Sequence, residues 1–208
     1  VEAARDEQAA IAGLCEAPGE DTLRSARDGF ADLVLAFSAV EPYRFGPARE
    51  DNRFERLFFW PDRRSIGQRQ VQRLLAEEDP AALDVASLRA KSVAVQGLIA
   101  LDYVIADDDA ASLASAPAGY RCHYAETIAA AVVATAEEIR DGWTAPDGYG
   151  ALLTAAGPDN PVFRSHGEVI QEFLEAGREQ LQVVRDMKIL AVIGDEPGAA
   201  KPKLAPFW

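Results

Sequence analysis

Residues 93–106 read VAVQGLIALDYVIA, and this stretch says most about the class of fold. At helical spacing its apolar side chains fall on almost every side, which is typical of a helix buried among other elements. The stretch is shorter than the roughly 18–20 apolar residues of a membrane span. We therefore expect a core helix over Lys91–Ile105 in a helical protein.

The remainder of the chain also predicts helices. β-branched residues are scattered, strictly alternating runs are absent, and alanine is abundant. The expected helices cover residues 3–15, 21–40, 66–76, 120–143 and 162–193, and a short helical turn covers 84–90. The last of these is the longest. Its apolar residues predict packing along its length, against helices not encoded in this chain, or else an exposed apolar face. The sequence therefore predicts an all-α protein.

The charge of the chain restricts its partners. Its 208 residues carry 34 Asp and Glu against 21 Lys and Arg, a net charge of −13, and 49% of them are hydrophobic. This composition excludes wholesale disorder. Because nonspecific binding to nucleic acid or anionic lipid depends on clustered Lys and Arg, we expect neither partner. Cations or basic protein surfaces are more compatible with this charge.

Cys15 and Cys122 are the only cysteines, and their spacing fits neither a disulfide framework nor a metal site. They are either two separate buried thiols or one long-range disulfide in an exported protein. Both lie at the ends of expected helices, and we predict the disulfide. The chain starts at Val1 without an export signal, which is compatible with removal of a signal segment.

Residues 41–70 form the least regular segment and read EPYRFGPAREDNRFERLFFWPDRRSIGQRQ. Seven arginines and six aromatic residues lie here, a combination that can indicate binding of single-stranded nucleic acid. Acidic residues in the same segment neutralise most of the positive charge. We favour a structural role, in which these arginines bridge helices by pairing with carboxylates.

The histidines offer little support for a metal site or for catalysis. His123 and Glu126 share a helix face at i, i+3, but such a pair arises easily by chance. His166 lies on the apolar side of the last helix, where we expect a partly buried packing residue. The chain has no phosphate-binding glycine loop and no nucleophile elbow.

Asp102 is the most informative single residue, since its helical neighbours Leu98, Ile99 and Ile105 are apolar. A buried carboxylate must be paired, hydrogen-bonded or protonated. We expect Asp102 to be mostly buried, ionised, and paired with an arginine of the segment 44–56. That pair either fixes a helix against a loop or belongs to a binding pocket. The candidate pocket consists of Asp102, Arg44, Arg53 and Arg56.

Several motifs together resemble the imelysin family of bacterial periplasmic proteins and lipoproteins. The resemblance covers nearly the whole chain. It is carried by YRFGP at 43–47, NR-x-ERLFFWPDR at 52–63, IG-x-RQVQ at 66–72, GL-x-ALDY at 97–103, RD-x-K at 185–188 and APFW at 205–208. The long block from Phe45 to Asp62 is the most specific part.

The resemblance implies two helical bundles related by a pseudo-twofold axis, with a site between them. Residues 1–160 would form the first bundle, and residues 161–208 would open a second bundle whose remainder is absent or on a separate piece. It also implies a periplasmic protein linked to iron uptake. Membrane association would come only through a removed lipid anchor, and the partner would be a small ligand or an iron-uptake component.

The resemblance also bears on enzymatic activity. Many imelysins carry Gly-x-His-x-x-Glu as a proposed metal site, where this chain has Gly97, Ile99 and Asp102. Iron or another divalent metal is thus implied by the family but not supported by these ligands. We expect a binding or accessory protein without catalytic residues or a cofactor. The alternatives are a metallopeptidase and a purely structural, partner-binding helical module.

Overall fold

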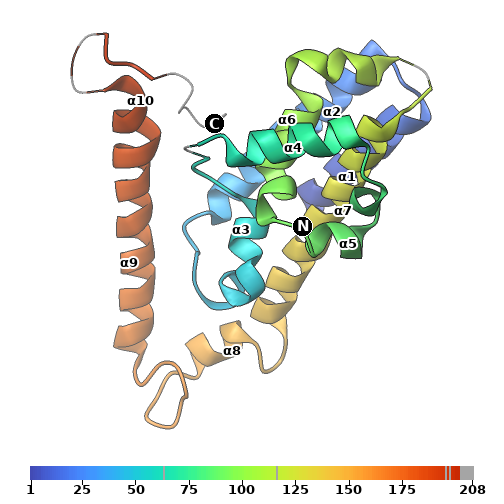
Figure 1. The fold of residues 1–208 in the computed structure, drawn as a ribbon. Helices are drawn as coiled ribbons and strands as arrows, with labels where there is room; N and C mark the ends of the chain where they lie inside the picture. The colour runs from blue at the N-terminus through green and yellow to red at the C-terminus, as the bar shows by residue number, and fades with distance from the viewer. Residues whose placement is uncertain (63, 116, 195, 197, 202–208) are drawn as a thin grey trace. The chain divides into compact units, whose positions relative to one another are not determined.

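The computed structural model describes residues 1–62, 64–115, 117–194, 196 and 198–201. Within these ranges the regular elements are all helices and none is a strand, so the predicted all-α fold is confirmed (Figure 1). The terminal APFW motif lies outside the described residues, as does Arg63. No helix in the described part is long and apolar enough to cross a membrane.

Contacts divide the chain into two compact units. The first contains residues 1–36 and 52–138, and the second contains residues 37–51 and those from 139 onward. These units differ in their limits from the two bundles expected over 1–160 and 161–208. The division into pseudo-twofold halves therefore stays a prediction.

The first unit holds most of the helices. They are α1 (Glu2–Glu16), most of α2 (Glu20–Val40), α3 (Arg53–Leu57), α4 (Ile66–Glu77), α5 (Val85–Arg89), α6 (Gly97–Ile105) and most of α7 (Tyr120–Thr144). A 3₁₀ helix, Asp108–Ala114, precedes α7. The expected limits of α1, α2, α4 and α7 are each met to within one or two residues.

The helix expected over Lys91–Ile105 is shorter than predicted. Residues Val93–Val95 form a 3₁₀ turn, and the α-helix begins at Gly97, whose φ of 81° lies in the left-handed region. Gly97 therefore separates the two helical pieces. The prediction of a buried helix is confirmed, since Leu98, Leu101 and Ile105 are each at most 1% exposed.

Neighbouring helices bind the main chain around α6. Arg27 of α2 donates from Nε to the carbonyl of Ile105 at 2.9 Å, and Arg121 of α7 donates from Nη1 to the carbonyl of Val104 at 2.9 Å. Since the last carbonyls of a helix have no partner within it, these arginines satisfy the end of α6. At the other end, the buried Tyr124 hydroxyl donates to the Val95 carbonyl at 2.6 Å.

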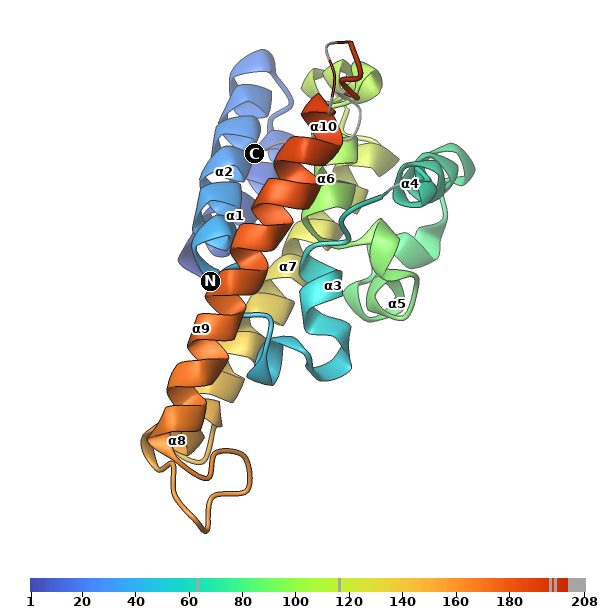
Figure 2. The same cartoon turned by 90° about the vertical axis from the view of Figure 1, so that its left-hand side faces the viewer.

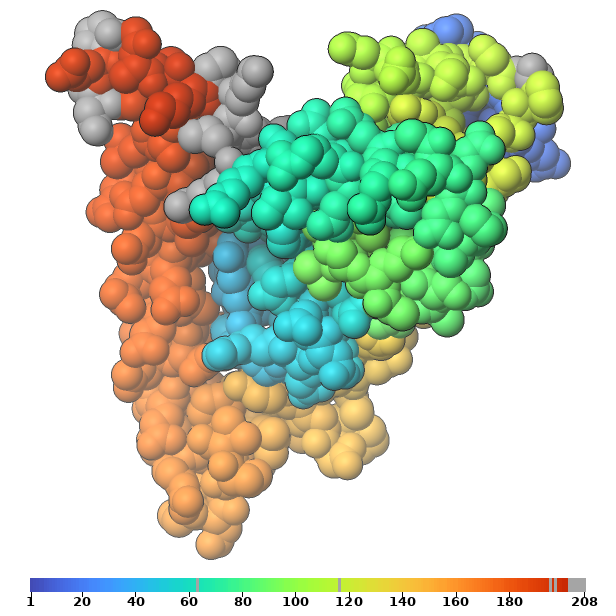
Figure 3. Space-filling model, in the orientation of Figure 1, coloured from blue at the N-terminus to red at the C-terminus, as the bar shows by residue number. Residues whose placement is uncertain are grey.

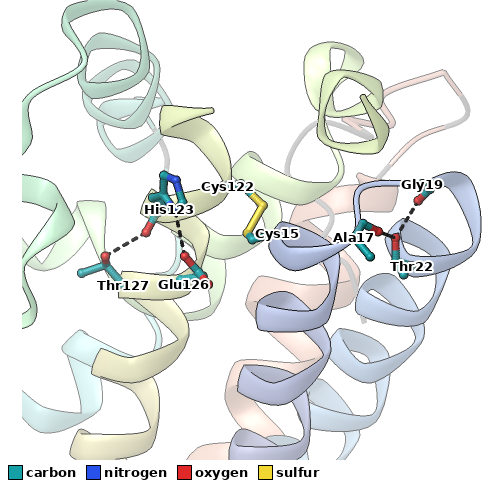
Figure 4. Close-up of a disulfide and its surroundings, with 8 residues drawn as sticks. All are labelled: Cys15, Ala17, Gly19, Thr22, Cys122, His123, Glu126 and Thr127. Atoms are coloured by element: carbon teal, nitrogen blue, oxygen red, sulfur yellow. Dashed lines mark hydrogen bonds and ion pairs between the residues drawn. A yellow bond between two sulfur atoms is a disulfide. The ribbon is translucent and has the colours of Figure 1, made fainter. Parts of the chain in front are cut away.

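A disulfide joins α1 to α7. Cys15 and Cys122 lie at disulfide distance, with a Cα–Cα separation of 5.7 Å (Figure 4). At the far end of α1, Arg5 forms an ion pair with Glu137 of α7. These two links set α1 antiparallel to α7. The predicted cysteine pairing is thereby confirmed at the level of geometry.

The second unit contains a long run of helix near the C-terminus, which Figure 2 draws in orange and red. Its elements are the ends of α2 and α7, α8 (Tyr149–Thr154), α9 (His166–Val183), a π-helical segment (Val184–Leu190) and α10 (Ala191–Ile193). The helix expected to start at residue 162 starts at His166, because the Asn160 side chain accepts the N–H groups of Val162 and Phe163 in a turn. Ser165 then caps α9.

His166 is exposed in the first turn of α9. The prediction of a partly buried packing residue was therefore wrong. The prediction assumed a helix that starts at residue 162, whose apolar side would include His166. The helix α9 begins only at His166 itself. Its exposure follows from its place at the start of the helix, beside the Ser165 cap.

Glu41 holds the second unit together through charge. It is 1% exposed, and its carboxylate accepts from Arg44 Nη2 at 2.8 Å, Gln180 Nε2 at 2.9 Å and Lys188 Nζ at 2.7 Å. Lys188 belongs to the RD-x-K motif and lies in the π-helical segment. A buried carboxylate with several charged and polar donors is well satisfied, so this cluster fixes the last helices against residues 41–44.

Aromatic rings of the segment 41–70 serve as core in the second unit. Phe45, 5% exposed, packs edge to face with Trp143 at 5.6 Å and Phe173 at 5.4 Å between ring centroids. Tyr43 adds a further edge-to-face contact with Phe173 at 5.9 Å. Such pairs contribute about 0.5–1.5 kcal/mol each beyond their burial. The arginine-aromatic pattern here reflects packing.

One face of α9 is exposed and apolar. Ile170, Leu174 and Leu181 are 61%, 69% and 72% exposed, and an added Cβ on Gly177 between them would meet nothing within 4 Å. Figure 3 draws this helix in orange. Contiguous exposed apolar surface promotes association.

We expect the disulfide to stabilise the fold. Closing the loop of 107 residues contributes roughly 2–5 kcal/mol in the chain-entropy account, so a Cys15→Ser, Cys122→Ser double variant should unfold at a clearly lower temperature. Thermal melts followed by circular dichroism measure the change. Two titratable thiols per chain in denatured, unreduced protein would contradict the pairing.

We also expect the exposed face of α9 to bind apolar dyes and to promote self-association. Leu181→Glu should weaken both without lowering the melting temperature, because Leu181 has little packing to lose. Dye fluorescence and light scattering measure these effects. Gln182→Glu, an adjacent exposed position with the same added charge, is the control. Equal effects of the two variants would show that charge alone is responsible.

Candidate functional site around Asp102

The start of α6 is fixed by a close backbone approach. A Cβ added to Gly97 would lie 2.1 Å from the carbonyl oxygen of Arg56 and 2.6 Å from that of Leu57. No side chain fits there, so the end of α3 rests directly on the first residue of α6. This contact positions the helix that carries Asp102.

Arg56 and Gln96 strengthen the same junction. The Arg56 guanidinium donates from Nη1 to the Arg89 carbonyl at 2.6 Å and to Gln96 Oε1 at 3.4 Å. Gln96 is 1% exposed, and its amide nitrogen donates to the Leu88 carbonyl at 3.3 Å. These bonds tie α3 to the end of α5 and to the residue before Gly97, which gives Arg56 a structural role.

Glu138 of α7 binds two arginines. It forms a two-bond fork with Arg89, at 2.8 Å from Nη1 and 2.7 Å from Nη2, and an ion pair with Arg53 Nε at 3.5 Å. The Arg89 hydrogen bond is the main reason that the pKa of Glu138 lies below its usual value, and Arg53 adds to the effect. The expected pairing of segment arginines with carboxylates is confirmed for Arg53.

Asp102 is partly buried and has no arginine partner among the described residues. Arg53 and Arg56 bond elsewhere, to Glu138, Gln96 and the Arg89 carbonyl. The expected arginine pair with Asp102 was therefore wrong, because these guanidiniums meet closer acceptors that are distant in sequence. Burial raises the pKa of Asp102 to about 6, and repulsion from Asp107 adds to the shift.

Tyr103 shares the acidic surroundings of Asp102. Its pKa is raised to about 12 by burial, and then by the charges of Asp62 and Asp102. Asp62 accepts the N–H groups of Ile66 and Gly67 at 2.6 and 2.8 Å and so caps α4. Asp107 pairs with Arg121 at 2.8 Å. Asp102 therefore differs from its acidic neighbours, whose carboxylates are engaged.

Arg44, the fourth predicted pocket residue, belongs to the second unit. Its Nη2 donates to the buried Glu41 carboxylate at 2.8 Å, as described above. Through this bond Arg44 contributes to the structure of the second unit. A ligand-binding role for Asp102, Arg44, Arg53 and Arg56 remains a prediction.

Gly97, Ile99 and Asp102, which stand where many imelysins have the proposed metal motif Gly-x-His-x-x-Glu, do not fit a divalent metal. Ile99, 5% exposed, offers an alkyl chain where many imelysins have histidine. The described residues contain no group of three or more His, Cys, Asp or Glu that could hold a metal ion. His123 bonds Glu126 at 2.9 Å through Nδ1 on the exposed first turns of α7, and this pair alone supplies too few ligands.

A cavity of about 350 Å³ lies beside the disulfide, between α4, the 3₁₀ helix 108–114 and the start of α7. Two of the polar side chains that line it, Tyr120 and Arg121, are engaged in structural bonds. Tyr120 donates to the Asp79 carbonyl at 2.9 Å, and Arg121 donates to Asp107 at 2.8 Å. None of the described residues that line this cavity belongs to α6, so the cavity is separate from the candidate site at Asp102 and Tyr103.

We expect the Asp102 carboxylate to lower stability near neutral pH. A pKa raised from 3.8 to about 6 means that the stabilisation from the protonated form is full below pH 3.8 and is lost as pH rises through about 6. Asp102→Asn should therefore be more stable than wild type by about 1–2 kcal/mol at pH 7, after discounting for solvent screening. Urea unfolding at pH 4 and pH 7 measures the difference. An Asn variant that is less stable than wild type at pH 7 would contradict this expectation and would indicate that Asp102 forms a buried ion pair.

Comparison with known proteins agrees with the resemblance in the motifs. The family profile described as imelysin, peptidase M75, matches residues 1–205. No curated protein matches. The fold is similar to the crystal structure of an imelysin-like protein from Psychrobacter arcticum 273-4, with a TM-score of 0.67 and 22% sequence identity over 92% of this chain.

The chain spans 57% of the length of that solved protein. At this level of identity the similarity concerns the fold alone. The family assignment rests on the profile match, which covers nearly all 208 residues, together with the helical architecture. We conclude that the chain belongs to the imelysin family.

Proposed function

We propose that this protein is a binding or accessory component of iron acquisition, without catalytic activity, and that its ligand contacts Asp102 and Tyr103. The link to iron uptake comes from the family. The observation that carries the site is the state of Asp102, a partly buried carboxyl that lacks an arginine partner among the described residues.

The chemistry of this pair favours a particular class of ligand. The charge of Asp107 repels the ionised Asp102, and the charges of Asp62 and Asp102 raise the pKa of the Tyr103 phenol. A cationic or hydrogen-bond-donating group beside Asp102 would relieve this repulsion and favour the ionised carboxylate. Ligand binding would therefore release a proton where the free carboxyl is still protonated, below about pH 6.

The cysteine pair supports an exported location. A disulfide forms and persists in oxidising compartments, of which the bacterial periplasm is one. The proposed periplasmic location is supported by this disulfide and by the family, whose members are commonly exported. A lipid anchor on a removed or preceding segment would be the route to membrane attachment.

The peptidase label of the family suggests a second activity, a metal-dependent proteolysis. Zinc peptidases hold the metal with three protein ligands and keep one position open for water. With Ile99 in place of the histidine and Asp102 as the single carboxylate of the motif, that ligand set is incomplete. We therefore favour binding over proteolysis.

The proposed function can be tested in cells. A strain that lacks the protein should grow more slowly than its parent when iron is withheld by a chelator. The wild-type chain should restore growth and Asp102→Asn should not, and the Asn variant is expected to be the more stable protein. Growth rate is measured with and without added iron.

Asp108→Asn is the matched control, since Asp108 is an exposed acid in the next helical element. It should restore growth as the wild type does. Absence of an iron-dependent growth defect would contradict the role in iron acquisition. Full restoration by Asp102→Asn would place the site elsewhere.

A further inference from the structure

Glu7 is buried on the inward face of α1, among Ala4, Ile11 and Leu14. It is 0% exposed, and neither carboxyl oxygen has a hydrogen-bond partner among the residues that the structure describes. A charge in such a place carries a large desolvation cost unless a cation or several donors compensate for it. The Asp102 site makes no use of this residue.

The carboxyl group lies against the backbone of α2. A Cβ added to Gly29 would lie 2.5 Å from Glu7 Oε2. The glycine therefore provides the space that the carboxyl fills. Any change in the size or hydration of this group acts directly on the contact between α1 and α2.

Charged groups on the elements around α1 do not compensate Glu7. Burial alone raises the pKa of Glu7 to about 8, with no contribution from a neighbouring charge. Asp28 and Asp32 of α2 are exposed, as are Asp108 and Asp109 of the 3₁₀ helix that precedes α7. Other charged side chains on these elements are bonded elsewhere: Arg27 donates to the Ile105 carbonyl, Arg5 pairs with Glu137, and Glu138 pairs with Arg89.

We propose that Glu7 is a pH-sensitive latch, which holds α1 against α2 as a neutral carboxylic acid and releases it as the carboxyl ionises. Release exposes the carboxylate to water, where it is hydrated at no cost. Retention of the ionised form would leave a bare charge between two helices. The closed arrangement is therefore favoured by acid.

The disulfide limits how far α1 can move. Cys15 in the last turn of α1 is bonded to α7, whereas the other end is held by the partly exposed Arg5–Glu137 ion pair. Exposed ion pairs contribute little to stability. Release should therefore begin at the N-terminal end of α1 and extend past Glu7 toward Cys15.

The direction of the pH effect follows from proton linkage. In the closed state, with α1 packed against α2, the Glu7 carboxyl keeps its proton up to about pH 8. In the released state it loses this proton above its ordinary pKa of 4.5. The stabilisation of the closed state is full below pH 4.5 and is lost as pH rises through about 8. Between these limits the opening constant should rise about tenfold for each pH unit.

Hydrogen exchange of the whole disulfide-bonded protein tests the proposal. The protection factors of the α1 amides, corrected for intrinsic exchange, should fall about tenfold per pH unit between pH 5 and pH 7.5 in wild type. Glu7→Gln keeps the shape of the side chain but does not titrate, so its protection factors should not vary with pH. Glu7→Met should behave in the same way.

Glu16→Gln is the matched control, because Glu16 is an exposed acid on the same helix. It should retain the wild-type pH dependence. The proposal is overturned if wild type and Glu7→Gln show the same dependence, or if Glu16→Gln abolishes it as completely as Glu7→Gln. The slope is decisive even if a variant is less stable overall, since a constant loss of stability shifts the protection factors without changing their pH dependence.

Discussion

The contact between Gly97 and the carbonyls of Arg56 and Leu57 is the constraint on which the first unit depends. It brings two backbones to a distance at which no side chain can stand between them. Once α6 starts at this point, Arg27 and Arg121 can reach the carbonyls at its other end, and Tyr124 can reach Val95. The position of Asp102 on α6 follows from the same contact.

The acids of this protein fall into two groups according to their surroundings. Glu41 and Glu138 each receive bonds from cations, and both join segments far apart in the sequence. Glu7 is buried and Asp102 is partly buried, neither has such a partner in the described ranges, and the pKa values of both are raised. The first group stabilises the fold as charged residues, whereas the second destabilises it when ionised. Groups of the second kind are the ones that a ligand or a change of pH can act on.

The substitution of Ile99 for the family histidine changes the chemistry available at the site. An alkyl side chain packs into the core, where Ile99 is 5% exposed, and it leaves Asp102 and Tyr103 as the polar groups on this part of α6. Oxygen groups of this kind can accept hydrogen bonds and attract cations. This chemistry supports the proposal that the site binds a ligand.

The helical class, most helix limits and the family could be predicted from the sequence, because periodicity, caps and motifs are local patterns. The cysteine pairing was predicted as one of two alternatives, since the two cysteines lie 107 positions apart and residue types alone do not show which helix ends meet. It misplaced the starts of α6 and α9, where Gly97 and Asn160 act through contacts beyond the helical pattern. Only the tertiary structure decided the partners of the arginines. Arg89 and Glu138 lie 49 positions apart, and Lys188 and Glu41 lie 147 apart. Such pairs depend on how helices meet in space. Residue types and spacing therefore could not show that Arg56 bonds Gln96, or that Asp102 and Glu7 have no cationic partner within the described part of the chain.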